Sequence, residues 1–170
     1  YLGLYALQHR GQESAGIVSA GDGALHPVRG MGLVHDVFTP NTLDRLPGRA
    51  AIGHVRYSTA GQSTLFNAQP LSIRCHRGEI AVAHNGNLVN GDVLRADLEQ
   101  KGHIFSTTSD TEAILHLIAR SRTEEMEDAI VEALQAVEGA YSLLFLTPAG
   151  MIAVRDPHGF RPLWVGKLGD

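Results

Sequence analysis

Residues 79–88 read Glu-Ile-Ala-Val-Ala-His-Asn-Gly-Asn-Leu, and the rest of the chain is best interpreted from this stretch. A short apolar run after Gly78 leads into an Asn-Gly pair, which is the pattern of a buried strand that ends in a polar turn. Asn85 brings a side-chain amide donor, and Gly86 lacks a Cβ, so its backbone N–H can approach a ligand closely. The pair is a candidate oxyanion hole. A simple β-hairpin is the alternative, because Asn-Gly between apolar runs is a strong hairpin signal.

The composition indicates one soluble domain. A chain of 170 residues can bury a sizeable core, and its 44% hydrophobic residues include no apolar run long enough to span a membrane. The 18 acidic residues outnumber the 14 basic ones, which gives a net charge of −4 and argues against nucleic acid as a partner. With a single cysteine and no signal peptide, we expect a cytoplasmic protein.

Apolar periodicity predicts the order of the elements. The chain begins at Tyr1 without a methionine, and its first apolar residues already have the spacing of a helix. We therefore expect the chain to be a fragment of a longer protein that continues at both ends. Further helices are expected at residues 39–46 and 90–100, from residue 109, and at 126–137. Strands are expected at 17–20, 24–29, 50–59, 69–75, 140–147 and 151–155, and near 164–165. Helices clustered between two sets of strands, without regular β-α-β alternation, predict an α+β fold of two sheets covered by helices.

Arg56 stands at the polar end of the predicted strand 50–59. A guanidinium is costly to leave unpaired beside an apolar strand, and its planar fork suits a ligand carboxylate. The alternative is an ordinary salt bridge with one of the acids of the chain, and the sequence does not decide between the two.

Asp110 lies at the predicted start of a helix. Ser109 and Glu112 have the spacing of a capping box, which places the helix start at Ser109. An acid in the first turn also favours the helix dipole, so a capping role and a ligand-binding role for Asp110 stay open.

These residues together describe a ligand. A cation, an anion and a pair of oxyanion donors are what an α-amino acid with a carbonyl group in its side chain would need. Glutamine fits this description.

At this point the sequence resembles the class II glutamine amidotransferases. The motifs that carry the resemblance are residues 54–59 (His-Val-Arg-Tyr-Ser-Thr), 84–88 (His-Asn-Gly-Asn-Leu) and 109–112 (Ser-Asp-Thr-Glu). Within this class, residues 9–16 and 155–163 make the chain most similar to the amidophosphoribosyltransferases, over essentially its whole length. The resemblance implies the four-layer αββα sandwich of the N-terminal-nucleophile hydrolases, with residues 1–170 forming the glutamine amidotransferase domain.

The resemblance also implies roles for the site residues. Arg56 and Thr59 would hold the carboxylate end of glutamine, and Asp110 would hold its ammonium group. Asn85 and the Gly86 amide would bind the oxyanion. The implied activity is hydrolysis of glutamine, which supplies ammonia for making 5-phosphoribosylamine from phosphoribosyl pyrophosphate, the first committed step of purine synthesis.

One departure from the family concerns the nucleophile. In the family it is a cysteine at the mature N-terminus, whose own α-amino group serves as base, and this cysteine would precede Tyr1. Cys75 lies in a predicted strand and is interpreted as a small buried apolar residue. We therefore expect residues 1–170 to carry the glutamine pocket without the nucleophile, and to show no turnover alone.

The resemblance further implies groups outside this chain. A phosphoribosyltransferase domain with its Mg²⁺ would follow residue 170, and some family members hold an iron–sulfur cluster through cysteines further downstream. The full-length protein would form a homo-oligomer. No cofactor or metal is expected within residues 1–170.

Two other functions are compatible with the same residues. A sister amidotransferase of the glucosamine-phosphate or asparagine synthetase type would share the glutamine pocket, and a non-catalytic glutamine-binding module would explain the missing cysteine. A metal site is not indicated, because the nine histidines are scattered singly, without helical ligand spacing or a cysteine cluster.

Overall fold

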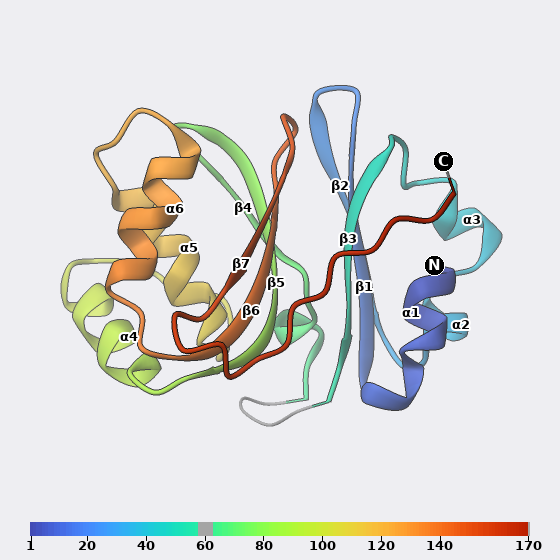
Figure 1. Cartoon of the computed structure of the whole chain (residues 1–170), viewed down its shortest axis with the longest axis horizontal. Helices are drawn as coiled ribbons and strands as arrows, with labels where there is room; N and C mark the ends of the chain where they lie inside the picture. Colours follow the sequence, from blue (N-terminus) through green and yellow to red (C-terminus); the bar gives the residue numbers. More distant parts are fainter. Residues whose placement is uncertain (58–62, 170) are drawn as a thin grey trace.

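The computed structural model describes residues 1–57 and 63–169, and Thr59 lies outside these residues. Two antiparallel sheets stack face to face, and helices cover the outer face of each (Figure 1). The layers follow the order helices, sheet, sheet, helices. The predicted αββα sandwich is confirmed.

The first sheet has the strand order β2-β1-β3. Its strands are β1 (Ser14–Gly21), β2 (Ala24–Met31) and β3 (Ala50–Arg56). The turn between β1 and β2 has positive φ at Asp22 (53°) and Gly23 (75°), the conformation that suits a tight hairpin. Three short helices cover the outer face: α1 (Leu2–Ala6), α2 (Val34–Val37) and α3 (Pro40–Leu43).

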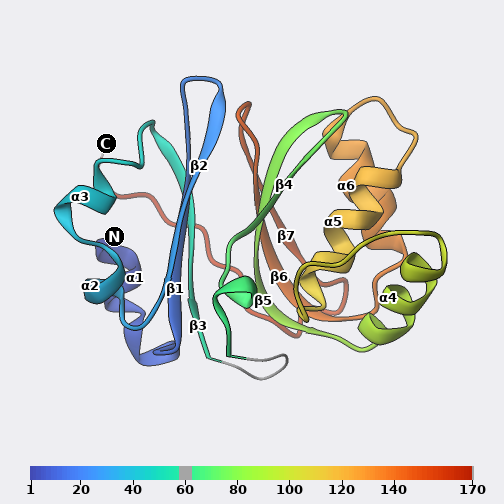
Figure 2. The same ribbon diagram turned by 180° about the vertical axis from the view of Figure 1, so that it is seen from behind.

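The second sheet has the order β4-β5-β6-β7. Its strands are β4 (Leu71–Cys75), β5 (Gly78–Leu88), β6 (Gly139–Leu146) and β7 (Met151–Arg155). Seen from behind in Figure 2, its outer face is covered by α4 (Gly91–Gln100), α5 (Thr111–Arg120) and α6 (Met126–Gln135). Two 3₁₀ turns, η1 (Gln8–Arg10) and η2 (Leu65–Asn67), complete the elements. Among the helices of the described residues, none has the length and apolar character of a membrane span.

Side chains of β5 alternate between two cores, as the period of a strand requires. Ile80 and Val82 belong to the large core beneath α4, α5 and α6. Ala81 and Ala83 belong to a smaller core between the two sheets, together with Ile52 of β3. Asn85 is the next residue of this second set, so its side chain faces the space between the sheets.

The predicted turn at Asn85-Gly86 is wrong, and so is the hairpin alternative. β5 continues to Leu88, and its register on β6 pairs Asn85 with Ser142 and Gly86 with Tyr141. The glycine serves this pairing, since a Cβ at position 86 would lie 2.1 Å from the carbonyl oxygen of Ala140. The Asn-Gly pair therefore allows close packing of two strands and does not reverse the chain.

Two smaller predictions are also wrong. The helix expected from Ser109 begins at Thr111, and the Glu112 carboxylate accepts the backbone N–H groups of Ser106 (2.8 Å) and Thr107 (2.7 Å) instead of closing a capping box. Residues 164–165, expected as a last strand, lie in a segment without regular secondary structure, outside both sheets.

Candidate functional site

A cavity of about 520 Å³ opens between the two sheets. Such a volume is typical of small-molecule sites. Four of the five predicted site residues line it: Arg56, Asn85, Gly86 and Asp110. They come from β3, β5 and the start of α5, so the fold brings together positions that are far apart in sequence.

Arg56 ends β3 on the face that also carries Ile52, the face toward the second sheet. Its side chain is only 7% exposed, and its Nη1 pairs with Oε1 of Glu13. The Glu13 backbone N–H also donates to the Arg56 carbonyl oxygen at 3.1 Å. The salt-bridge alternative is therefore realised, and it neutralises a buried cation. A guanidinium presents its N–H donors in a planar fork, a geometry that matches a carboxylate.

The backbone of β5 has a free edge at the cavity. β4 pairs with β5 only up to Val82, so the next amides on that edge need other partners. The His84 N–H donates to Oε1 of Gln69 at 2.7 Å, and the Leu88 N–H donates to Oδ2 of Asp110 at 2.9 Å. Since amides alternate between the two edges of a strand, the Gly86 N–H points to this same edge, between the other two.

Asp110 directly precedes α5, and its side chain is 21% exposed. Within the described structure its carboxylate caps no amide of that helix. Oδ2 accepts from Leu88, as above, and Oδ1 accepts from the Thr111 hydroxyl at 3.3 Å. The capping alternative is thus not realised, and Asp110 is a carboxylate held in the cavity wall.

His84 of β5 contacts the two residues at the start of α5, Asp110 and Thr111. Its Nδ1 lies 2.9 Å from the Thr111 hydroxyl and 3.7 Å from Oδ1 of Asp110. Because the Thr111 proton is donated to Asp110, we infer that Nδ1–H of His84 donates to Thr111. Burial lowers the pKa of His84, against the raising effect of Asp110 and with a lowering effect of Arg161.

His54 joins the two sheets at the cavity. Its Nε2 lies 3.1 Å from the carbonyl oxygen of His84. Since a carbonyl only accepts, Nε2 carries the proton. Burial lowers the pKa of His54 to about 4, although its hydrogen bond to His84 raises it. A neutral His54 therefore fixes β3 to β5 one residue before Asn85.

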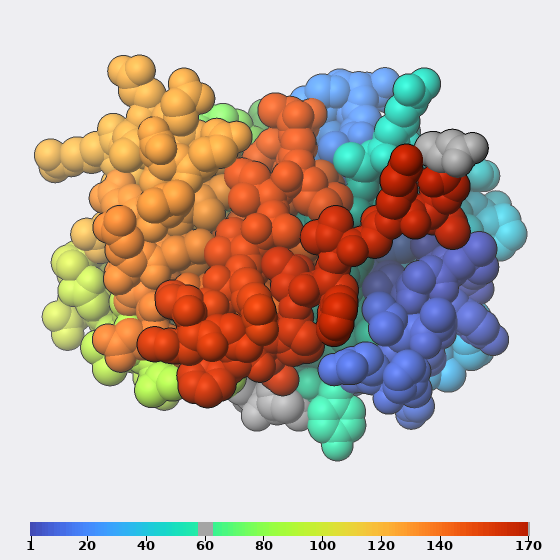
Figure 3. All heavy atoms as spheres, in the orientation of Figure 1, coloured from blue at the N-terminus to red at the C-terminus, as the bar shows by residue number. Residues whose placement is uncertain are grey.

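Sequence reasoning missed several wall residues. His54 and His84 stand inside the quoted motifs, but their role depends on burial and on partners that a motif does not reveal. The cavity also includes Arg161, Pro162 and Trp164 from the C-terminal segment, which crosses the face between the two halves in Figure 3. The sequence pattern indicated no site role for this segment, because residues 155–163 carried only the family resemblance and residues 164–165 only an expected strand. In the part of the chain that the structure describes, no three His, Cys, Asp or Glu side chains gather as a metal site requires.

Comparison with known proteins gives the class first. Residues 54–170 match the family model described as a glutamine amidotransferase domain. The chain belongs to this family of glutamine amidotransferase domains.

The individual relatives are amidophosphoribosyltransferases. The chain is 56% identical to the chloroplastic amidophosphoribosyltransferase 2 of Arabidopsis thaliana, over 98% of this chain and 30% of that protein. It is 49% identical to the enzyme of Methanocaldococcus jannaschii, over 98% of this chain and 36% of the relative. The chain thus spans about a third of the length of these relatives.

Solved structures agree. Glutamine phosphoribosylpyrophosphate amidotransferase from Bacillus subtilis, complexed with ADP and GMP, superposes with a TM-score of 0.92 at 47% identity, over 99% of this chain and 36% of that one. A predicted glutamine amidotransferase from Pseudomonas aeruginosa shares the fold, with a TM-score of 0.55 at 17% identity over 85% of this chain and 60% of that one.

Proposed function

We propose that this chain is the glutamine-hydrolysing domain of an amidophosphoribosyltransferase. Its ammonia would pass to a phosphoribosyltransferase domain outside residues 1–170, which would use it to make 5-phosphoribosylamine from phosphoribosyl pyrophosphate. The observation that carries the proposal is the single cavity that joins Arg56, Asp110 and the Asn85-Gly86 pair. Similarity to amidophosphoribosyltransferases over 98% of the chain supports it.

Two charged groups would orient glutamine. Arg56 binds the α-carboxylate through its planar guanidinium fork, and Thr59 assists it. Asp110 binds the α-ammonium group with its remaining lone pairs. Support comes from the fixed positions of both side chains, one paired with Glu13 and the other hydrogen-bonded to Leu88. Preorganised charges of this kind bind a zwitterion without reorganising.

Asn85 and Gly86 would bind the oxyanion. The sulfur of the nucleophile bonds to the amide carbon, and the carbonyl π electrons move to the oxygen, which the Asn85 side chain and the Gly86 N–H stabilise. The intermediate then collapses, the C–N bond breaks, and nitrogen leaves as ammonia with the thiol proton. Water hydrolyses the thioester to glutamate and restores the thiol. Overall, glutamine and water become glutamate and ammonia.

Cys75 does not fit the role of nucleophile. It pairs with Gly78 at the far end of β5, eight residues before Gly86. At the rise of a strand this is roughly 25 Å from Gly86. We therefore propose that the nucleophile lies outside residues 1–170, as the resemblance implies. Cys75→Ser in the full-length protein should leave ammonia release unchanged, and its abolition would contradict this assignment.

Binding and turnover test the function separately. In the full-length protein, calorimetry should show loss of glutamine binding in Arg56→Ala and in Asp110→Ala. Arg74→Ala is the matched control, because Arg74 lies on β4 with its side chain 76% exposed. Unchanged binding in both site variants would refute the pocket.

An acceptor assay separates the rival functions. Glutamate formation that depends on phosphoribosyl pyrophosphate supports the proposal. Dependence on fructose 6-phosphate or aspartate would indicate a sister amidotransferase, and binding without any ammonia release would indicate a glutamine-binding module.

The remaining expectations concern the whole protein. We keep as proposals the Mg²⁺ of the transferase domain, a homo-oligomeric assembly and a cytoplasmic location. An iron–sulfur cluster would depend on cysteines outside residues 1–170. Mass measurement and metal analysis of the full-length protein test the assembly and the two metal groups.

A further inference from the structure

The segment after β7 folds into a tight arm, which we define as residues 156–162. Its centre is the buried Asp156, whose Oδ1 accepts the backbone N–H groups of His158 (3.1 Å) and Phe160 (3.0 Å). Its Oδ2 accepts the N–H of Arg161 at 2.9 Å. One carboxylate thus binds three amides of the arm and fixes its conformation.

Arg155 holds the same arm from the other side. Its Nε donates to the Arg161 carbonyl oxygen at 2.7 Å, and its Nη2 donates to the Gly159 carbonyl oxygen at 2.6 Å. Both the N–H and the C=O of Arg161 are therefore bound. The backbone at Arg161 is therefore anchored, and the fold fixes its place in the cavity lining.

The arm contacts β6 at Ser142, the residue that pairs with Asn85 of β5. The Ser142 hydroxyl donates to the Pro162 carbonyl oxygen at 3.0 Å, and Ser142 is the partner of Asn85 in the pairing of β5 and β6. Paired residues on adjacent strands share one face of the sheet, so Asn85, Ser142 and the arm lie on the same side. Arg161 lines the cavity together with Asn85 and Gly86.

Arg161 differs from Arg56 in its charge balance. Glu13 pairs with Arg56, whereas the ion pairs of the described residues include none to Arg161. The positive charge of Arg161 acts on His84 of β5, where it adds to the effect of burial and lowers the pKa of the imidazole. The cavity wall beside Asn85 and Gly86 therefore carries a positive charge that the mechanism above does not use.

We propose that Arg161 stabilises the negative charge that develops on the glutamine carbonyl oxygen at Asn85 and Gly86. This role rests on the proposed function and adds a third group to the oxyanion site. A cation placed before the reaction lowers the energy of the charged intermediate more than that of the neutral substrate amide.

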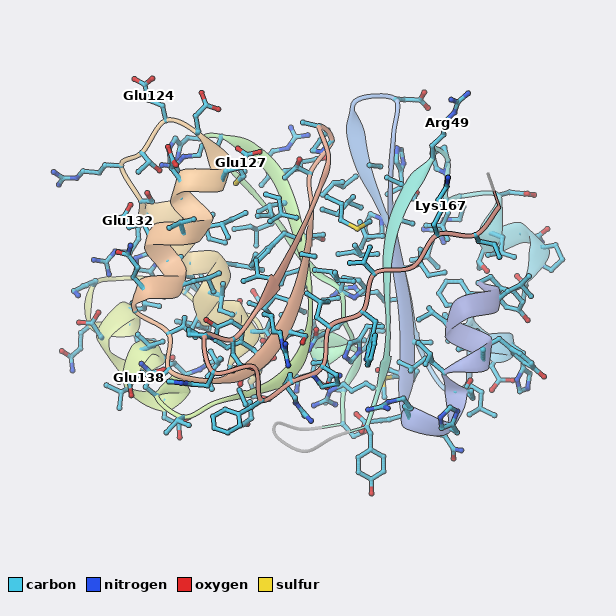
Figure 4. All side chains as sticks on the ribbon, viewed as in Figure 1. Arg49, Glu124, Glu127, Glu132, Glu138 and Lys167 are labelled. Carbon is cyan, nitrogen blue, oxygen red and sulfur yellow. The ribbon has the colours of Figure 1, made fainter. Side chains whose placement is uncertain are left out.

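Kinetics of the full-length protein with glutamine test this role. Arg161→Met should lower kcat for ammonia release about 10- to 100-fold with KM within about threefold, because the interaction is made in the transition state. Arg161→Lys should recover part of the loss, since it restores charge without the fork. Lys167→Met is the control, because it removes a cation from the same C-terminal segment (labelled in Figure 4) at a residue outside the cavity lining.

The outcomes separate this role from its rivals. A KM that rises with unchanged kcat would show that Arg161 binds the substrate carboxylate, and unchanged kinetics would show no role; either result overturns the proposal. Thermal unfolding of each variant identifies loss of the arm, and Arg161→Gln is the second neutral variant if Arg161→Met does not fold. If the unsubstituted protein releases ammonia and the Arg161 variants release it equally fast, only the role of Arg161 is refuted. If the unsubstituted protein releases no ammonia from glutamine, the proposed function is refuted and this role with it.

Discussion

Asn85 is the residue whose proposed role is most specific to the transition state. Its side chain faces the cavity because it continues the set of β5 positions that face the other sheet. It contributes no charge that would hold the zwitterionic ends of glutamine. A donor in this position should therefore affect the reaction rate and leave substrate binding largely intact.

Asn85→Ala should lower kcat about 10²- to 10³-fold in the full-length protein, as loss of an oxyanion donor does. KM for glutamine should stay within a few-fold of the original value, measured by steady-state ammonia release. Asn41→Ala, at an exposed position of α3, is the control. Equal losses in kcat/KM and in binding affinity would remove Asn85 from this role.

His54 gives a prediction about pH. Burial lowers its pKa from an ordinary value of 6.5 to about 4 in the folded protein. Between these two values the unfolded chain binds the proton and the folded chain does not, so stability falls as pH falls from about 6.5 to about 4. A pKa difference of this size corresponds to roughly 3 kcal/mol of unfolding free energy.

The measurement is urea unfolding at several pH values. His54→Gln keeps an N–H donor for the His84 carbonyl but does not titrate, so its stability should depend less on pH over this range. His35→Gln is the control, because His35 is 55% exposed. An unchanged pH dependence in His54→Gln would contradict the assignment.

At the scale of elements, the sequence was sufficient where apolar periodicity was strong. The helices α4, α5 and α6 and the strands β2, β6 and β7 were predicted close to their observed bounds, whereas β1 begins at Ser14, three residues before the predicted strand. The predicted turn at Gly86 and the predicted capping box at Glu112 were wrong for one reason. Each was inferred from neighbouring residues in the sequence, but the observed partners of both residues lie outside the local pattern. Gly86 packs against β6, and Glu112 binds the preceding loop.

Gly86→Ala should therefore weaken the pairing of β5 and β6. The new Cβ would lie 2.1 Å from the Ala140 carbonyl oxygen and 2.9 Å from Nε2 of His84. Overpacking of this kind costs about 1–3 kcal/mol and sometimes more. The urea midpoint should fall accordingly, whereas Gly150→Ala, where no heavy atom of the described residues lies within 4 Å of the new Cβ, should change it little. Equal midpoints for the two variants would contradict this account of the glycine.

For the whole molecule, the sequence predicted the layers and four of the residues that line the cavity. The helices between two sets of strands indicated two covered sheets, and the polar residues at the end of apolar runs and at a helix start indicated Arg56, Asn85 and Asp110. Neither pattern predicted how the sheets face each other, because that depends on small residues such as Ala81 and Ala83 and on the His54 bond. The C-terminal arm was missed for a similar reason, since Asp156 organises it through backbone amides.

The spacing of the two sheets should then control glutamine affinity. Ile52 lies in the core between the sheets, two residues before His54, and Ile118 lies in the core beneath α5; both are almost fully buried. Truncation of either to alanine should cost about 2–5 kcal/mol of unfolding free energy. Only Ile52→Ala should also raise the Kd for glutamine, because it loosens β3 against β5 and so moves Arg56 relative to Asn85. Calorimetry well below the unfolding temperature of both variants measures this difference, and similar Kd values in the two would mean that the cavity geometry does not depend on the core between the sheets.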